Sequence, residues 1–168
     1  MNQPKPFALP PGATYLSKML GGMIGLPVLE YHCDLSPIAQ KRAQRSGNRN
    51  SKYAMFNPQA QLKRGVQHIL ASQHEGDLLD CPLFAFAFFW FKAPDSWSEK
   101  KKQRAYGLKE PKIYHDTKPD RDNLEKFLND CCEGSILKND SRIYGGFIYK
   151  DYRQDEGFDL YLHTPKHT

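Results

Sequence analysis

The segment from 82 to 91, PLFAFAFFWF, is the longest apolar run in this chain of 168 residues. Successive side chains of a strand point to opposite faces, and this run places apolar side chains on both. Such a strand needs cover on each side, so it is predicted to be a central strand of a sheet or a contact with a second copy of the chain. The run is about half as long as the roughly 20 residues that a membrane-spanning helix needs, which excludes that role.

Three other segments have the pattern of strands. The segment 28–35, VLEYHCDL, alternates apolar and polar residues with a period of two, which predicts a half-buried strand. The segments 143–150 and 157–163 are predicted to be the closing strands, and the second of them alternates in the same way.

Two segments have the spacing of amphipathic helices. The first spans 57–72, where Asn57 can cap the helix and Pro58 suits its first position. The second spans 122–133, and Gly134 stands where a left-handed residue commonly ends a helix. Strands combined with two main helices predict an α+β domain, in which the helices pack on a small mixed or antiparallel sheet. The apolar residues of the second helix recur at i, i+3, i+4 and i+7: Leu124, Phe127, Leu128 and Cys131.

The length of the chain fits one domain, predicted to span 28–168. The preceding residues 1–27 are rich in Pro and Gly and are predicted to form an irregular arm. The first residues lack the charged-then-apolar order of a secretory signal, which favours a cytoplasmic location. No C-x-x-C spacing is present, so the four cysteines are interpreted as reduced thiols: Cys33, Cys81, Cys131 and Cys132.

Charge is distributed unevenly along the chain. Residues 1–115 contain 16 Lys and Arg against 8 Asp and Glu, whereas residues 116–160 contain 7 against 11. A basic surface beside an acidic cluster suits a nuclease, because cations bind phosphates and carboxylates bind metal ions. A solvated surface of uneven charge is the alternative. The residues predicted to bind DNA are Lys41, Arg42, Arg45, Arg49, Lys52 and Lys118.

A second basic segment, 95–112, is interpreted as a loop-like connector. It contains the run from Lys100 to Arg104, which either contacts phosphates or is a solvated run of charge. The sequence leaves both interpretations open.

Asp120 and Asp122 stand one residue apart, directly after Pro119, where the second helix is about to begin. Asp122 with Glu125 resembles a capping box, in which a carboxylate satisfies an N–H group of the first turn. This interpretation leaves Asp120 without a role. Adjacent carboxylates repel each other unless a cation lies between them, and Mg²⁺ typically binds one or two carboxylates together with water and phosphate. The pair is therefore a candidate metal site.

Two further residues could complete such a site. Lys126 lies one helical turn beyond Asp122, where it can form an i, i+4 salt bridge or stabilise negative charge that develops on a phosphate. Asp140 precedes the strand predicted at 143–150, although a lone Asp in that position is commonly a turn residue.

The segment from His115 to Lys126 reads H-x-x-K-P-D-x-D-N-L-x-K and is followed by Asp130, Gly134 and the sequence NDSRI. This pattern resembles the RusA family of Holliday junction resolvases. The match is dense over about 115–143, and the layout of predicted elements is compatible over about 28–163. The chain departs from the family at Asn139, where the first of two acids is common.

The resemblance implies a small, homodimeric, Mg²⁺-dependent endodeoxyribonuclease that cuts four-way DNA junctions by paired symmetric nicks. Such enzymes act in DNA recombination and repair or in phage DNA processing, and Mn²⁺ can substitute for Mg²⁺. Carried over by position, Asp120, Asp122 and Asp140 would bind the metal and, with Lys126, carry catalysis. Two identical sites suit a junction of two-fold symmetry, which a homodimer provides.

Two alternatives remain open at this stage. One is a nuclease of the same fold that prefers flaps or other branched DNA. The other is a catalytically silent protein that binds branched DNA. The presence of all three aspartates beside Lys126 argues against the silent protein, because carboxylates next to phosphates would weaken binding alone.

Overall fold

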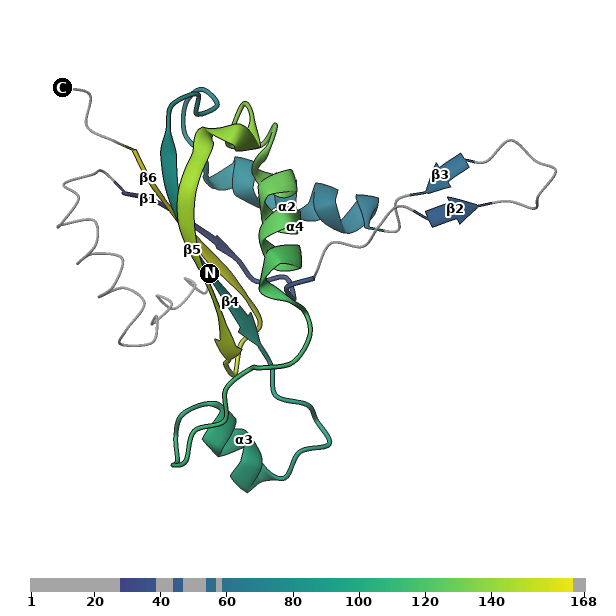
Figure 1. Ribbon diagram of the computed structural model, residues 1–168, viewed down its shortest axis with the longest axis vertical. Helices are drawn as coiled ribbons and strands as arrows, with labels where there is room; N and C mark the ends of the chain where they lie inside the picture. The colour runs from purple at the N-terminus through teal and green to yellow at the C-terminus, as the bar shows by residue number, and fades with distance from the viewer. Residues whose placement is uncertain (1–27, 39–43, 47–53, 57–58, 165–168) are drawn as a thin grey trace, which may run out of the picture.

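The computed structural model describes residues 28–38, 44–46, 54–56 and 59–164 (Figure 1). The predicted arm at 1–27 lies outside these residues, as does the predicted helix start at 57–58. Four of the residues predicted to bind DNA also lie outside them: Lys41, Arg42, Arg49 and Lys52.

A mixed four-stranded sheet forms the centre of the domain. Its strands are β1 (Val28–Cys33), β4 (Leu83–Phe91), β5 (Ile143–Tyr152) and β6 (Gly157–His163), in the order β1-β6-β4-β5. Strand β4 pairs antiparallel with β6 and parallel with β5, so the apolar run is a central strand. A separate two-stranded ribbon, β2 (Gln44–Ser46) with β3 (Ala54–Phe56), lies apart from the sheet beyond the start of α2 (Figure 1).

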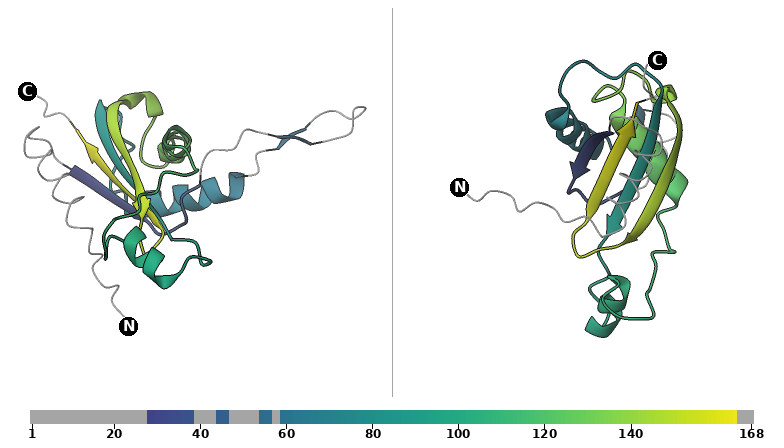
Figure 2. Two further views of the ribbon diagram at one scale, coloured as in Figure 1. Left: turned by 60° about the horizontal axis from the view of Figure 1, so that its bottom comes forward. Right: turned by 90° about the vertical axis from the view of Figure 1, so that its left-hand side faces the viewer.

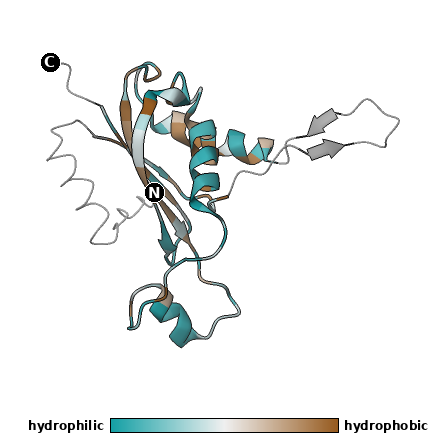
Figure 3. Ribbon diagram, in the orientation of Figure 1, coloured by the Kyte–Doolittle hydropathy of each residue, from teal (hydrophilic) through white to brown (hydrophobic). Residues whose placement is uncertain are grey.

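Two main helices, α2 (Ala60–Gln73) and α4 (Arg121–Cys132), cover one face of this sheet (Figure 2). Their apolar side chains join those of the sheet in one core, and Figure 3 shows hydrophilic residues on the outer side of α4. The α+β architecture with two packed helices is therefore confirmed. Among the described residues, no helix is long and apolar enough to cross a bilayer. All four cysteines are free thiols, as predicted.

Helix α4 has the buried stripe that its sequence predicts. Leu124, Phe127, Leu128 and Cys131 are all buried. The helix ends before Gly134, which has a φ of +75° and so adopts the left-handed conformation expected after a helix. Burial among these residues raises the pKa of the Cys131 thiol to about 12, which keeps it protonated.

A third helix, α3 (Glu99–Ala105), occupies the segment interpreted from sequence as a loop. Ser98 caps it by accepting a hydrogen bond from the Lys101 amide at 3.4 Å. A small apolar cluster around Ala93, Ala105 and Tyr152 fixes this helix to the end of β5. The loop interpretation was wrong because so short a helix buries only one residue and shows no apolar period.

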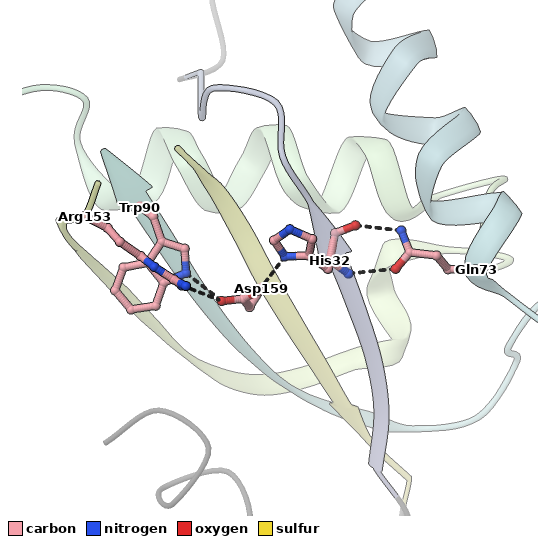
Figure 4. Close-up of polar contacts among 5 residues, drawn as sticks. All are labelled: His32, Gln73, Trp90, Arg153 and Asp159. Carbon is pink, nitrogen blue, oxygen red and sulfur yellow. Dashed lines mark hydrogen bonds and ion pairs between the residues drawn. The ribbon is translucent and has the colours of Figure 1, made fainter. Parts of the chain in front are cut away.

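The face of β4 away from α2 and α4 is aromatic, with buried Phe86, Phe88 and Trp90. Beside them the buried Asp159 accepts a hydrogen bond from Trp90 Nε1 at 2.6 Å and lies 2.7 Å from His32 Nδ1 (Figure 4). A buried carboxylate needs such partners to stay charged. This network joins β1, β4 and β6 and has a structural role.

The last turn of α2 satisfies the backbone of β1, which is an edge strand. The Gln73 side chain accepts a hydrogen bond from the His32 amide at 2.8 Å and donates one to the His32 carbonyl at 2.6 Å (Figure 4). One side-chain amide thus makes both bonds that a further strand would make, which protects part of the edge from pairing with another chain.

Candidate functional site

The two clustered aspartates lie at the start of α4. Asp120 is the N-cap residue, and Asp122 lies in the first turn. Asp120 accepts no capping hydrogen bond through its side chain, and both residues are exposed. The helix begins one residue earlier than predicted, so the interpretation of Asp122 as the cap was wrong. Helix capping therefore accounts for neither carboxylate.

Lys126 stands beside this pair. Its Nζ lies 3.4 Å from Asp122 Oδ2, in the i, i+4 arrangement predicted from sequence. The two side chains are 61% and 65% exposed, so solvent weakens the ion pair and it contributes little to stability. Lys126 is therefore free to reorient toward an anion that approaches the two carboxylates.

Asp140 lies near the opposite end of α4, in the short 3-10 helix η1 (Asp140–Arg142) (Figure 1). Helix α4 has 12 residues and is therefore about 18 Å long. Among the described residues, no group of three or more Asp, Glu, His or Cys side chains is placed to hold a metal ion. One chain thus brings Asp120 and Asp122 together but leaves Asp140 apart from them.

Asn139, where the family commonly has an acid, caps the short helix that begins at Asp140. Its Oδ1 accepts a hydrogen bond from the Ser141 amide at 2.9 Å. Its amide donates to Glu133 Oε1 at 3.3 Å, a contact in which a second carboxylate would be repelled. These two hydrogen bonds explain why an Asn, and not an acid, occupies position 139 in this chain.

Asp80 holds the residues on both sides of Asp140, which the sequence did not indicate. It pairs with Lys138 Nζ at 2.9 Å and with Arg142 Nη2 at 2.6 Å. The hydrogen bond from Lys138, assisted by Arg142, lowers the pKa of the Asp80 carboxyl. The sequence showed that two cations, Lys138 and Arg142, flank Asp140. It did not indicate that Asp80 is the residue with which they pair.

Lys150 holds the turn before Asp120 and was also missed. From β5, its Nζ donates hydrogen bonds to the backbone carbonyls of Thr117 and Pro119. Burial lowers the pKa of this ammonium group, and the negative charges of Asp120 and Asp116 oppose that shift. A single Lys in a strand gives no pattern from which such a contact could be predicted.

His115 packs in the interior at the start of the sequence motif. Its ring lies 4.3 Å from that of Phe91 and 4.7 Å from that of Tyr152, measured between centroids. Burial, and then the positive charge of Lys150, lower the pKa of His115. These contacts favour a packing role for His115 over a role as a general base.

Two of the residues predicted to bind DNA fall within the described part of the chain. Lys118 is exposed and lies two residues before Asp120. Arg45 lies in β2. The exposed Lys100 of α3 adds positive charge to the segment that leads to Lys118.

An α+β domain that presents paired carboxylates, a lysine and exposed cations has the groups that enzymes acting on nucleic acid phosphates use. Comparison with protein families agrees with this class. The family model for endodeoxyribonuclease RusA matches residues 34–160, which is most of the chain. The chain therefore belongs to the RusA endodeoxyribonuclease family. A search of curated proteins found no match.

Proposed function

We propose that this protein is a Mg²⁺-dependent endodeoxyribonuclease that resolves four-way DNA junctions by paired nicks. The observation that carries the proposal is the pair of exposed carboxylates, Asp120 and Asp122, which lie two residues apart at a helix start and are not used for capping. Membership of the RusA family supports the nuclease class and the branched DNA substrate.

The pair suits part of a magnesium site. Carboxylate oxygens are ligands that Mg²⁺ prefers, and one or two of them with water and phosphate complete its shell. Bound there, the ion would neutralise charge on the scissile phosphate and lower the pKa of a bound water molecule. Asp120 and Asp122 hold this position on one chain, and Lys126 stabilises negative charge that develops during cleavage.

A homodimer supplies the remaining ligand in this proposal. Asp140 lies about one helix length from the pair in its own chain, so we place Asp140 from the second subunit at the site. The edge strand β5 carries the exposed aromatic residues Tyr144 (60% exposed) and Phe147 (48% exposed), which suit an interface with another copy. Two such sites related by two-fold symmetry match the two nicks.

Binding of the junction arms is assigned to cations around this site. Lys118 lies next to the acidic pair, and the basic segment that includes Arg45 provides further contacts to phosphate. Such contacts give affinity that falls steeply with salt and depends weakly on sequence.

Incubation of the full chain with a synthetic four-way junction tests the proposal. Symmetric paired nicks with Mg²⁺, and their loss with EDTA, are the expected result. Faster cleavage of a flap than of the junction would favour a nuclease for other branched DNA. Binding of the junction without cleavage in Mg²⁺ or Mn²⁺ would favour the catalytically silent alternative and contradict the proposal.

A further inference from the structure

The segment that leads into α4 is attached to one strand of the sheet at three successive residues. Lys112 Nζ pairs with the buried carboxylate of Asp151 at 2.5 Å. The His115 ring packs on Tyr152. The third attachment is Lys150, whose Nζ donates to the carbonyls of residues 117 and 119, the latter at 2.8 Å.

Lys150 is the attachment closest to the candidate metal site. The two carbonyls that it binds flank Lys118, and Asp120 follows directly. An ammonium group has three N–H donors, and the two carbonyls accept from two of them. Asp120 also lies near enough for its negative charge to act on the ammonium group.

The other side of this contact is rigid. Lys150 lies within β5, where it is paired with Phe89 of the buried central strand β4. A functional group is held accurately when a regular element of the scaffold positions it. The backbone at 117–119 has no strand or helix of its own, so these hydrogen bonds define where its carbonyls lie.

We propose that Lys150 is a positioning residue that fixes the turn at 117–120 and thereby orients Asp120 and Asp122 for metal binding. This inference rests on the proposed function, because it assigns to Lys150 a role outside the direct metal ligands.

Binding of Mn²⁺ to the full chain tests this role by isothermal titration calorimetry without DNA. Lys150→Met removes both hydrogen bonds and the charge while it retains an unbranched apolar stem. Loss of a partner that orients metal ligands typically weakens metal binding by about 10- to 100-fold, which is the expected effect. Lys150→Arg keeps donors for both carbonyls and should recover part of the affinity. Lys109→Met, which changes an exposed lysine of the same connector, should bind Mn²⁺ like the wild type.

Hydrogen exchange of the metal-free proteins separates this inference from the proposed function. The amides of Asp116 and Leu124, which donate to the carbonyls of Tyr114 and Asp120 at the two ends of this turn, should exchange faster in Lys150→Met than in the wild type, whether or not Mn²⁺ binds. If the wild type does not bind Mn²⁺, the proposed function fails. The exchange of these amides still reports whether Lys150 holds the turn at 117–120.

Two results would overturn the positioning role. One is weaker Mn²⁺ binding by Lys150→Met with unchanged exchange of these amides, since the weaker binding would then not arise from release of the turn. The other is unchanged Mn²⁺ binding with faster exchange. Circular dichroism verifies folding, and Lys150→Gln, which keeps a donor, serves as the second variant if Lys150→Met does not fold.

Discussion

The two neighbouring carboxylates at the start of α4 are the residues on which the proposed chemistry depends. Asp120 occupies the N-cap position, where an Asp side chain usually accepts a hydrogen bond from the first turn, and it does not do so here. A carboxylate that makes no capping hydrogen bond is available for another role. Its removal should therefore affect activity more than stability.

Asp122→Asn is expected to abolish cleavage of a four-way junction while leaving junction binding within about 2-fold of the wild type. Amide and carboxylate have the same shape, but the amide lacks the charge that Mg²⁺ requires. Junction cleavage and a gel-shift titration measure the two properties. Asp155→Asn, an exposed acid in the turn between β5 and β6, is the matched control and should cleave normally. Equal loss of binding and cleavage in Asp122→Asn would contradict a ligand role.

His163 makes the stability of the fold dependent on pH. The residue is fully buried, its ring lies 5.0 Å from that of Phe86, and neither ring nitrogen has a hydrogen-bond partner in the described part of the chain. Burial lowers the pKa of His163 below its ordinary value of 6.5. The unfolded chain therefore binds this proton more readily than the folded chain.

The free energy of unfolding should consequently decrease as the pH falls from about 6.5 toward the lowered pKa, by at most about 1.4 kcal/mol per pH unit for one proton. His163→Phe removes the titrating group and should reduce this dependence. Urea unfolding between pH 7 and pH 5 measures it. His68→Gln, at an exposed position on α2, should leave the dependence unchanged. An identical slope in wild type and His163→Phe would rule out this explanation.

Helix α3 extends the domain beyond the end of the sheet that is nearer to the start of α4 (Figure 1). Trp97, which precedes α3, packs on Tyr152 with 5.4 Å between ring centroids. Tyr152 lies two residues after Lys150 on β5, which is a distance of about 7 Å along a strand. The base of α3 is therefore close to the turn that carries Asp120, and we expect its lysines to contact phosphates of a bound junction.

We expect Lys100→Ala with Lys102→Ala to weaken binding of a four-way junction and to reduce its salt dependence. Each phosphate contact adds about 0.9 to the slope of log affinity against log salt, so the slope should fall by about 2. Fluorescence anisotropy at several salt concentrations measures this slope. Lys92→Ala is the control, because Lys92 already pairs with Asp95 at 3.8 Å. An unchanged slope in the double variant would indicate that these lysines are only a solvated run of charge.

One chain separates the acids that the resemblance places in one site. The pair and Asp140 lie near opposite ends of a helix about 18 Å long. In a dimer whose sites combine both chains, each subunit would supply the pair to one site and Asp140 to the other. Metal binding would then depend on how the two subunits are placed relative to each other in the dimer.

Mixing of inactive variants tests this arrangement. Asp122→Asn and Asp140→Asn should each be inactive, but a heterodimer of the two should regain one intact site and nick one strand of the junction. Random assortment places about half of the dimers in this form. Denaturation and refolding of an equimolar mixture, followed by a nicking assay, measures the recovery.

A mixture of Asp120→Asn with Asp122→Asn is the matched control and should stay inactive, because both changes fall in the same half of the site. Recovery in this control would show that the assay detects something other than site completion. Absence of recovery in the first mixture, with heterodimers present, would contradict a site shared between subunits.

The elements that sequence patterns predicted are those in which a local period reports burial. The stripe in α4, the alternation in β1 and the apolar run of β4 all indicate which side chains lie inside. In β6 the alternation located the strand, but the half-buried pattern was wrong, because all of its residues are buried, including the polar Asp159 and His163. The motif around Asp120, Asp122 and Lys126 could also be recognised from sequence, because its members lie within two helical turns of one another. Helix α3 was missed because it has seven residues and one buried side chain.

The contacts that complete the candidate site could not be read from such patterns. Lys150 reaches the carbonyl of Pro119 across 31 positions of sequence, and Asp80 reaches Lys138 across 58. Whether residues so far apart meet depends on the order and register of the strands and on how α4 crosses the sheet. The separation of Asp140 from Asp120 has the same origin. Local chemistry therefore specified which side chains could bind a metal, and the packing of distant segments specified which of them lie together in one chain.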